Sequence, residues 1–250
     1  SLIADALSHV TLAGIAGSLY LSQSVAAFAL LNPIYLGILA SVTGSIFIER
    51  LRSLYKHYEE LAIPIIMSAG LGLSAILISL AKGFQTDLSS YLFGSVSAVS
   101  RQDLYVVVAI ALVVIVFLCL FFKELFVLSF DEEYAKASGL PAKWVHFLFM
   151  IVVALVIAAS MRIVGILLVS SLVTLPVAAA MRIAKGFKHA ILYSVIFGET
   201  AVVIGLVSAY YLDLMPGGTI VVTSILILLL VIFGKKMLNK LANSKEGNVA

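Results

Sequence analysis

The sequence predicts an all-α, polytopic membrane protein. Of its 250 residues, 62% are hydrophobic and only 12% are charged, whereas a soluble domain carries about 25% charged residues. Apolar runs of about 20 residues, long enough for a helix to cross a bilayer, recur along the whole chain. They lack the alternation of membrane β-barrel strands. The one cysteine, Cys119, excludes an internal disulfide and a thiolate cluster.

About eight transmembrane helices are expected. They are residues 2–22, 26–48, 60–82, 103–122, 144–160, 163–182, 189–211 and 218–234. The fifth and sixth spans meet at Ser160-Met161-Arg162 with almost no loop. Their combined length is nearly twice that of one crossing, so two spans joined by a tight outer turn fit best. The alternative places Arg162 inside the membrane as an interior charge.

The distribution of basic residues orients the chain. The loops on one side carry Arg50, Arg52, Lys56, Lys123, Lys136, Lys143, Arg182, Lys185, Lys188, Lys235, Lys236, Lys240 and Lys245. The loops on the other side carry only Lys82, Arg101 and Arg162. Because cytoplasmic loops are enriched in Lys and Arg, the first side is predicted to be cytoplasmic. Residues 1–238 then form one transmembrane domain, and residues 239–250 form a polar cytoplasmic tail.

Two segments depart from simple spans. Residues 85–102 are half apolar but too polar to cross the membrane alone, and they are interpreted as an interfacial or re-entrant piece on the outer face. Pro176 lies inside an apolar span, where it frees a backbone carbonyl and is expected to kink the helix. Small residues at helix-packing spacing, such as Gly14 with Ser18 and Gly70 with Ser74, predict close helix contacts.

Asp5 and His9 are the first candidate site. They lie one helical turn apart, so both project from the same face of a segment otherwise suited to lipid. Ionisable groups at membrane depth are costly and normally face a cavity, a partner or a pathway. A carboxylate and an imidazole together suit borderline divalent metals such as zinc. The pair therefore predicts a metal pathway.

The longest cytoplasmic loop, residues 129–141, is the second candidate site. Ser129 can cap a short amphipathic helix whose first turn is acidic, and Gly139 followed by Pro141 is a stop signal. A solvated connector and a docking element for a cytoplasmic partner both fit this pattern. The residues proposed for docking are Asp131, Glu132, Glu133, Ala135 and Gly139.

Glu199 is a third, weaker candidate. A carboxylate in the middle of a membrane span is expected to have a functional role, unless it stays protonated and hydrogen-bonded. His57, His146 and His189 lie near the cytoplasmic ends of spans and are interpreted as interfacial residues. The chain has no phosphate-binding loop, zinc-protease helix or nucleophile elbow. It is therefore not expected to be an enzyme or an ATPase by itself, and nothing in it indicates a nucleic-acid partner.

Several segments resemble the permease subunits of bacterial ABC importers for zinc, manganese and related metals. They are residues 1–9, 92–95 (Leu-Phe-Gly-Ser), 129–140, 162–180 and 216–221 (Pro-Gly-Gly-Thr-Ile-Val). The resemblance implies a homodimeric permease in the bacterial cell membrane, with no permanently bound cofactor. Its partners are two copies of a cytoplasmic ATPase and an extracytoplasmic metal-binding protein. The family's Asp-x-x-x-His motif falls on Asp5 and His9, and its coupling helix falls on residues 131–139.

The resemblance also leaves choices open. Zinc is favoured over manganese or iron as the transported ion, on overall likeness alone. Family members carry one further span before the opening motif, so one N-terminal helix is expected to be missing from this chain. The rivals are a permease for iron–siderophores or cobalamin, which needs a wide cavity, and a proton-coupled secondary metal transporter that uses Glu199.

Overall fold

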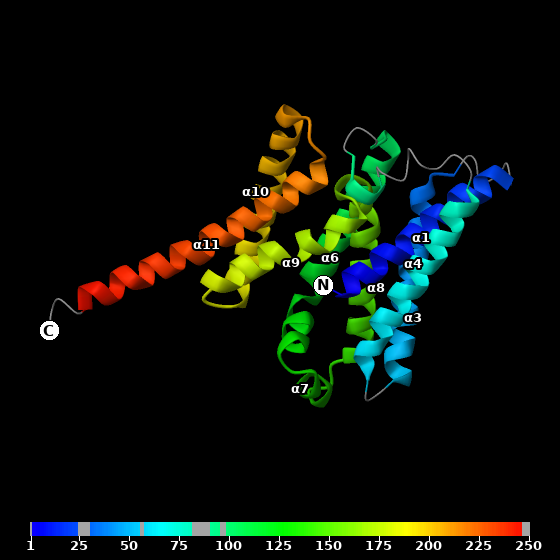
Figure 1. Cartoon of the computed structure of the whole chain (residues 1–250). Coiled ribbons are helices and arrows are strands. Elements are labelled where there is room, and N and C mark those ends of the chain that lie inside the picture. Colours follow the sequence, from blue (N-terminus) through cyan, green and yellow to red (C-terminus); the bar gives the residue numbers. More distant parts are fainter. Residues whose placement is uncertain (1, 25–30, 56–57, 82–90, 96–98, 247–250) are drawn as a thin grey trace.

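The computed structural model describes residues 2–24, 31–55, 58–81, 91–95 and 99–246, and within these residues no strand forms. The principal elements are α1 (Leu2–Ser24), α3 (Pro33–Leu54), η1 (Glu59–Leu61), α4 (Ala62–Leu80), α6 (Arg101–Phe130), α7 (Glu132–Ala137), α8 (Ala142–Val164), α9 (Ile166–Ile183), α10 (Phe187–Leu212) and α11 (Pro216–Glu246). The all-α prediction is confirmed. Figure 1 shows long helices in two groups, with α1, α3, α4 and α8 together and α10 and α11 at the opposite side of the molecule.

Seven of the described helices are long and apolar enough to cross a membrane. The remaining expected span corresponds to α9, whose apolar stretch, Leu168–Ile183, is shorter. The second span begins at Pro33 rather than at residue 26, because Asn32 caps α3 by accepting a hydrogen bond from the Ile34 amide at 3.1 Å. Residues 25–30 lie outside the described part of the chain.

The turn between α8 and α9 lies later than the sequence predicts. Helix α8 continues through Ser160 and Arg162 and ends at Val164, and Gly165 makes the turn with φ +89° and ψ 152°. The backbone of Arg162 is therefore in the last turn of a helix rather than in a loop. The helix continues past Ser160 because Met161 and Val164, in its last turn, are buried against the rest of the bundle.

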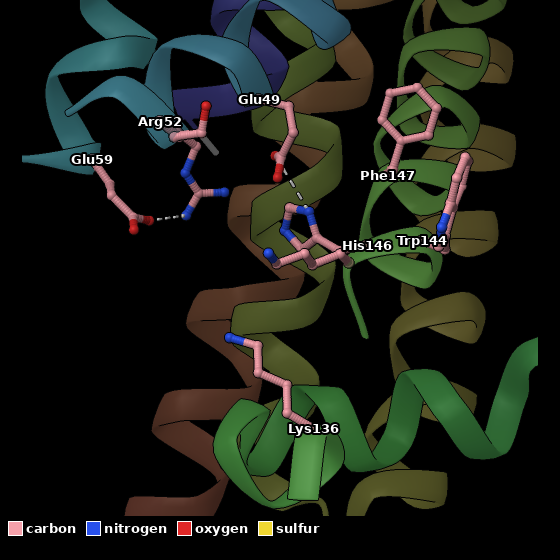
Figure 2. A pocket seen from close by; sticks show the side chains of 9 residues that line it. Glu49, Arg52, Glu59, Lys136, Trp144, His146 and Phe147 are labelled. Atoms are coloured by element: carbon pink, nitrogen blue, oxygen red, sulfur yellow. Dashed lines mark ion pairs between the residues drawn. The ribbon is translucent and has the colours of Figure 1, made fainter. Parts of the chain in front are cut away.

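At one end of the bundle α3 ends and α8 begins, and we call it the basic end after Arg52, Lys136 and Lys143, which line a cavity there. Helix α6 reaches it by continuing to Phe130, well beyond the predicted boundary at residue 122, and its geometry departs from helical at Phe121 (φ −104°, ψ 16°). At this end α3, η1, α7 and α8 line a cavity of about 730 Å³ that is open to solvent (Figure 2). The predicted span boundary therefore marks a kink and not a helix end.

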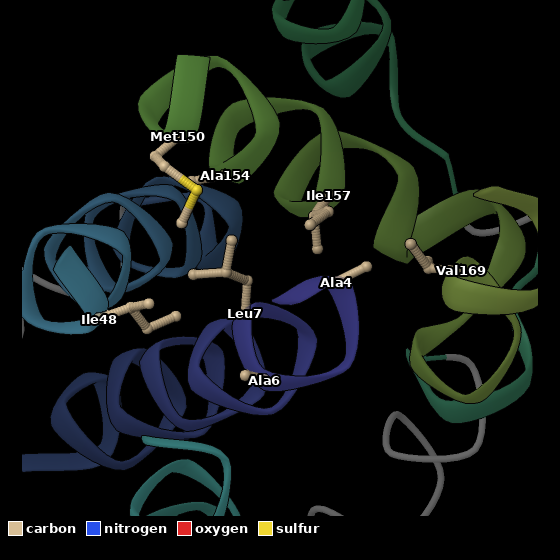
Figure 3. Close-up of a cluster of buried hydrophobic side chains, with 8 residues drawn as sticks. All are labelled: Ala4, Ala6, Leu7, Ile48, Met150, Ala154, Ile157 and Val169. Atoms are coloured by element: carbon tan, nitrogen blue, oxygen red, sulfur yellow. The ribbon is translucent and has the colours of Figure 1, made fainter. Parts of the chain in front are cut away.

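Helix α1 is the centre of the first group and contacts α3, α4, α8 and α9. Leu7 lies between Ile48 of α3 and Met150 and Ala154 of α8 in a buried apolar cluster (Figure 3). Small residues bring the backbones together. A Cβ at Gly14 would lie 2.5 Å from the Leu36 carbonyl oxygen, and one at Gly70 would lie 2.8 Å from the Val10 nitrogen. The predicted close packing at these two glycines is confirmed.

The opposite end of the bundle is fastened by a buried carboxylate. Asp103, which is 1% exposed, accepts hydrogen bonds from the Ser100 amide (2.7 Å), the Ser100 hydroxyl (2.8 Å) and the Asn32 side-chain amide (2.6 Å). Ser100 caps α6 and Asn32 caps α3, so one side chain connects two helix N-termini. Buried polar groups of this kind are costly when their partners are lost.

Asp103→Ala is therefore expected to destabilise the protein by about 2–4 kcal/mol, because it leaves buried donors unpaired and removes half of a capping box. Thermal unfolding in detergent measures the loss. Asp131→Ala is the matched control, since Asp131 is an exposed N-cap and its removal costs about 1 kcal/mol. Equal losses for the two variants would contradict the assignment of Asp103 as a fastening residue.

Candidate metal pathway and coupling surface

Asp5 and His9 both lie on α1, and each side chain is half-buried. Four residues of helix place them about 40° apart around the axis, as the sequence predicts. The backbone at His9 and Val10 touches α4 at Gly70, where a Cβ would lie 3.0 Å from the His9 carbonyl carbon. Helix α1 therefore holds the pair at a point where its backbone is fixed by close packing.

The pair lies at mid-depth in the bundle. Gly70 is near the middle of α4, and Leu7, between the two residues in sequence, packs on Ala154 near the middle of α8. An ionised carboxylate at this depth needs a compensating charge or strong hydrogen bonds. A divalent cation supplies such a charge.

One protomer brings two donor residues to this point. Among the described residues no group of three or more His, Cys, Asp or Glu side chains is placed to hold a metal ion. Within this chain Asp5 and His9 can therefore offer at most one carboxylate and one imidazole as candidate ligands.

Glu199 is not brought to the pair. It is an exposed residue near the middle of α10, and a Cβ at its neighbour Gly198 would lie 3.9 Å from the Pro176 ring of α9. Helix α10 packs on α9 and α11, whereas α1 packs on α3, α4, α8 and α9. Within the described protomer Glu199 therefore belongs to a different surface, which α9 separates from α1 (Figure 1).

The predicted coupling segment contains a helix, but a shorter one. Helix α7 covers Glu132–Ala137 at the lower end of the molecule in Figure 1. Its N-cap is Asp131, which accepts a hydrogen bond from the Tyr134 amide at 2.9 Å. The predicted cap, Ser129, is wrong: its hydroxyl donates to the Leu125 carbonyl within α6 at 2.7 Å.

Helix α7 is buried on one side and exposed on the other. Ala135 is completely buried, whereas Glu133 and Tyr134 are exposed. Gly139 closes the helix with φ +78°, and the Leu140 amide donates to the Ala135 carbonyl at 3.1 Å. The segment therefore presents an acidic and aromatic surface on a firmly packed turn.

Sequence reasoning missed a junction of three glycines. A Cβ at Gly165 would lie 2.5 Å from the Gly94 nitrogen and 2.5 Å from the Leu92 carbonyl oxygen. Gly94, with φ +78°, abuts the backbone of Ile163 and Val164, and Gly217 abuts the Val164 and Phe93 carbonyls. Three segments far apart in sequence, 92–94, 163–165 and the start of α11, are thus in direct backbone contact. The sequence motifs include all three segments, but they give no indication that the segments contact one another.

The structure describes some of the remaining residues that the sequence analysis singles out. His146 forms an ion pair with Glu49, with 3.4 Å between Nδ1 and Oε2. His189 lies at the start of α10, with its ring centroid 6.2 Å from that of Tyr193. His57 and residues 85–90 and 96–98 fall outside the described part of the chain. Of the expected interfacial segment, residues 91–95 and 99–102 are described. Tyr91 is buried beside Leu12 and Met161, and residues 101–102 already belong to α6.

Comparison with known proteins gives a consistent result. The model of the ABC 3 transport family matches residues 1–235. The chain is 36% identical to the manganese import system permease protein ScaB of Streptococcus gordonii, over 93% of this chain and 81% of that protein. It is 34% identical to a probable metal transport system membrane protein of Treponema pallidum, over 93% of this chain and 84% of that one.

A solved structure is also similar. A chain of PsaBC from Streptococcus pneumoniae in complex with Fab matches with a TM-score of 0.78 and 33% identity, covering 92% of this chain and 80% of that chain. The helical bundle thus defines a multi-pass membrane permease. The chain belongs to the ABC 3 transport family, whose members are metal-cation permeases of ABC uptake systems.

Proposed function

We propose that this chain is the membrane subunit of an ABC importer that moves a divalent transition-metal ion into the bacterial cytoplasm. The observation that carries the proposal is the position of Asp5 and His9, a carboxylate and an imidazole at mid-depth in a family of metal-cation permeases. The importer is completed by a second copy of the chain, two ATPase subunits and an extracytoplasmic metal-binding protein.

A second copy completes the ligand set in this proposal. Two carboxylates neutralise a divalent ion in a low-dielectric site, where an unpaired charge is prohibitive. Two imidazoles add nitrogen ligands, which suit transition metals better than calcium or magnesium. A site formed by four donors from two separate protomers binds and releases an ion more readily than a closed structural site does. If the Asp5–His9 pair proves structural, Glu199 is the next residue to test as a metal ligand.

Manganese is the first ion to test and zinc is the second. The preference for zinc from sequence likeness finds no support in the names of the reported relatives, because ScaB is named for manganese import. Carboxylates suit manganese and imidazoles suit zinc, so the donor set accepts both ions. Selectivity at such sites follows geometry and metal availability rather than affinity alone.

The proposed orientation places the basic end and the C-terminal tail, residues 239–250, in the cytoplasm. In the sequence, Lys and Arg concentrate in the loops of one predicted side, and α7 belongs to one of these loops. The ATPase then docks on α7, with Asp131, Glu132, Glu133, Ala135 and Gly139 as its proposed contact or shaping residues. Closure of the ATPases on ATP moves α7 and, through residues 138–141, the start of α8.

Tyr134→Ala is expected to weaken association with the ATPase about 30-fold, because exposed tyrosines at interface centres contribute about 2 kcal/mol. Tyr134 is 62% exposed on α7. Binding of the purified ATPase to the detergent-solubilised permease measures the effect. Tyr105→Ala, at the other end of α6 and 72% exposed, is the control and should bind normally. Unchanged binding of both variants would remove α7 from the interface.

The test of the proposed function is uptake of radioactive manganese and zinc into proteoliposomes that hold the full-length permease and its ATPase, with the binding protein outside. We expect uptake only when ATP is enclosed. Uptake driven by a proton gradient without ATP would favour the secondary-transporter alternative. Uptake of an iron–siderophore in place of either ion would favour the wide-cavity alternative.

A further inference from the structure

An apolar groove lies at a seam of the bundle, where α6 and α8 meet the start of α10. Its volume is about 370 Å³. Helix α6 packs mainly on α8, whereas α10 packs on α9 and α11. The walls of the groove include Leu118, Phe122 and Leu125 of α6, Phe149 of α8, and Phe187 and Ile191 of α10. We propose that the groove binds an acyl chain of an anionic phospholipid, whose head group is held by lysines at its rim.

The interior of the groove suits hydrocarbon. Among the described residues that line it, Ser129 and His146 are the polar ones, and none is acidic. The Ser129 hydroxyl donates to the Leu125 carbonyl at 2.7 Å, and His146 pairs with Glu49, with 3.4 Å between Nδ1 and Oε2. Because both side chains are already engaged, a polar ligand would lose its hydration without gaining partners. An acyl chain carries no such cost.

One wall of the groove is a cluster of phenylalanine rings. The ring centroid of Phe187 lies 5.0 Å from that of Phe126 in an edge-to-face contact, 5.9 Å from that of Phe130 and 6.2 Å from that of Phe122. Aromatic pairs favour such tilted arrangements. The rings hold Phe187 in place before a ligand arrives, and a preformed wall lowers the entropic cost of binding.

The groove lies at the level where acyl chains meet head groups. Hydrophobicity along the chain places the ends of three spans at residues 122, 144 and 189, and the residues that line the groove are close to these ends. Trp144, which is 68% exposed, precedes His146 at the start of α8 (Figure 2). Tryptophan is enriched at membrane–water interfaces. A lipid in the groove therefore has its acyl chain among the spans and its head group at the rim.

Three exposed lysines, Lys123, Lys185 and Lys188, lie at this rim. Lys188 directly follows Phe187, and Lys185 is in the turn before α10. Lys123 precedes Phe126 by three residues, about 60° away around the axis of α6, so it flanks the contact between Phe126 and Phe187. Long lysine side chains reach phosphates from such positions. A head group between Lys123 and Lys188 links α6 to α10 across the seam.

The neighbouring acids do not oppose an anionic head group at this position. Glu124 is half-buried and lies about 200° around α6 from Phe126, so it projects from the opposite side of the helix. The Asp131 carboxylate is directed to α7, where it accepts from the Tyr134 amide at 2.9 Å. Basic pockets between membrane spans bind anionic head groups. The rim therefore favours an anionic lipid over a zwitterionic one.

Lipid preference is tested by native mass spectrometry of the full-length permease with its ATPase, titrated with phosphatidylglycerol or with phosphatidylcholine of the same acyl chains. We expect phosphatidylglycerol to bind about 25-fold more tightly, since each lysine near a membrane surface contributes about fivefold. Lys123→Gln combined with Lys188→Gln should abolish the preference. Lys143→Gln, an exposed lysine of the other cavity, should keep it. Equal affinities in the wild type, or an unchanged preference in the double variant, would overturn the proposal.

The position of the lipid is tested by photocrosslinking in nanodiscs that contain equal amounts of the two lipids. The crosslinker p-benzoylphenylalanine replaces Phe149, which lines the groove and is 38% exposed. Its lipid adducts should contain phosphatidylglycerol about fivefold or more in excess. The same crosslinker at Leu112, an exposed residue of α6 far from the groove, should label both lipids equally. Crosslinks from position 149 to a second permease copy or to the ATPase would show that protein covers the groove and would overturn the proposal.

Discussion

Asp5→Asn and His9→Gln should each reduce ATP-dependent metal uptake at least about 100-fold. Substitutions beside a metal site, in residues that only orient its ligands, already cost about 10–100-fold, and these two remove proposed ligands. The first change removes the carboxylate charge and the second removes the imidazole nitrogens, while both roughly keep the size of the side chain. Helix α1 should therefore still pack through Leu7 and Gly14 on its other faces. Initial uptake rates in proteoliposomes measure the loss.

Two controls separate a lost ligand from a damaged fold. Asp213→Asn is the matched acid-to-amide change, since Asp213 ends α10 with φ +52°, a conformation that Asn also tolerates. It should transport at the wild-type rate. ATP hydrolysis by the assembled complex reports folding of the Asp5 and His9 variants and should persist. Normal uptake by both variants would make the pair structural and direct attention to Glu199.

Gly165→Ala should destabilise the permease by about 2–6 kcal/mol, the second large effect that we expect. Its φ of +89° with ψ 152° is a conformation essentially reserved for glycine, which costs about 1–3 kcal/mol for other residues. The added methyl group would also lie 2.5 Å from backbone atoms of Leu92 and Gly94, which cannot move aside like a side chain. Overpacking costs a further 1–3 kcal/mol or so.

The measurement is the midpoint of thermal unfolding in detergent, together with the yield of folded permease. Gly72→Ala is the control, because a Cβ at Gly72 would meet no atom within 4 Å and alanine favours a helix. It should be neutral or slightly stabilising. If Gly165→Ala unfolds at the wild-type temperature, the three-segment contact does not hold the ends of α8, α9 and α11 together.

Much of the fold follows from hydrophobicity along the chain. Apolar stretches long enough to span a membrane predicted the long helices that the structure describes. The reason is that a backbone in lipid must satisfy its hydrogen bonds within each segment. The errors fall at ends. Ser129 and Asp131 are both good caps, and the choice between them depended on where α6 stops. Val164 rather than Ser160 ends α8, because burial in the bundle extends a helix past a polar residue.

The site was predictable only where its residues are close in sequence. Asp5 and His9 share a helical turn, so their common face follows from helix geometry. Glu49 and His146 are almost a hundred residues apart, and only the packing of α3 on α8 brings them together. The same holds for Gly94 and Gly165, and for Asn32 and Asp103. A single sequence contains no local signal for such contacts.

The most direct test of the account is to locate the transported ion in the complete transporter. Crystals of the full-length permease dimer with its ATPase, grown with manganese, would give the ion's position from anomalous scattering at the manganese edge. We predict a peak between the Asp5 carboxylates and the His9 imidazoles of the two copies. A pathway ion bound by other residues, with Asp5 and His9 out of contact, would contradict the account.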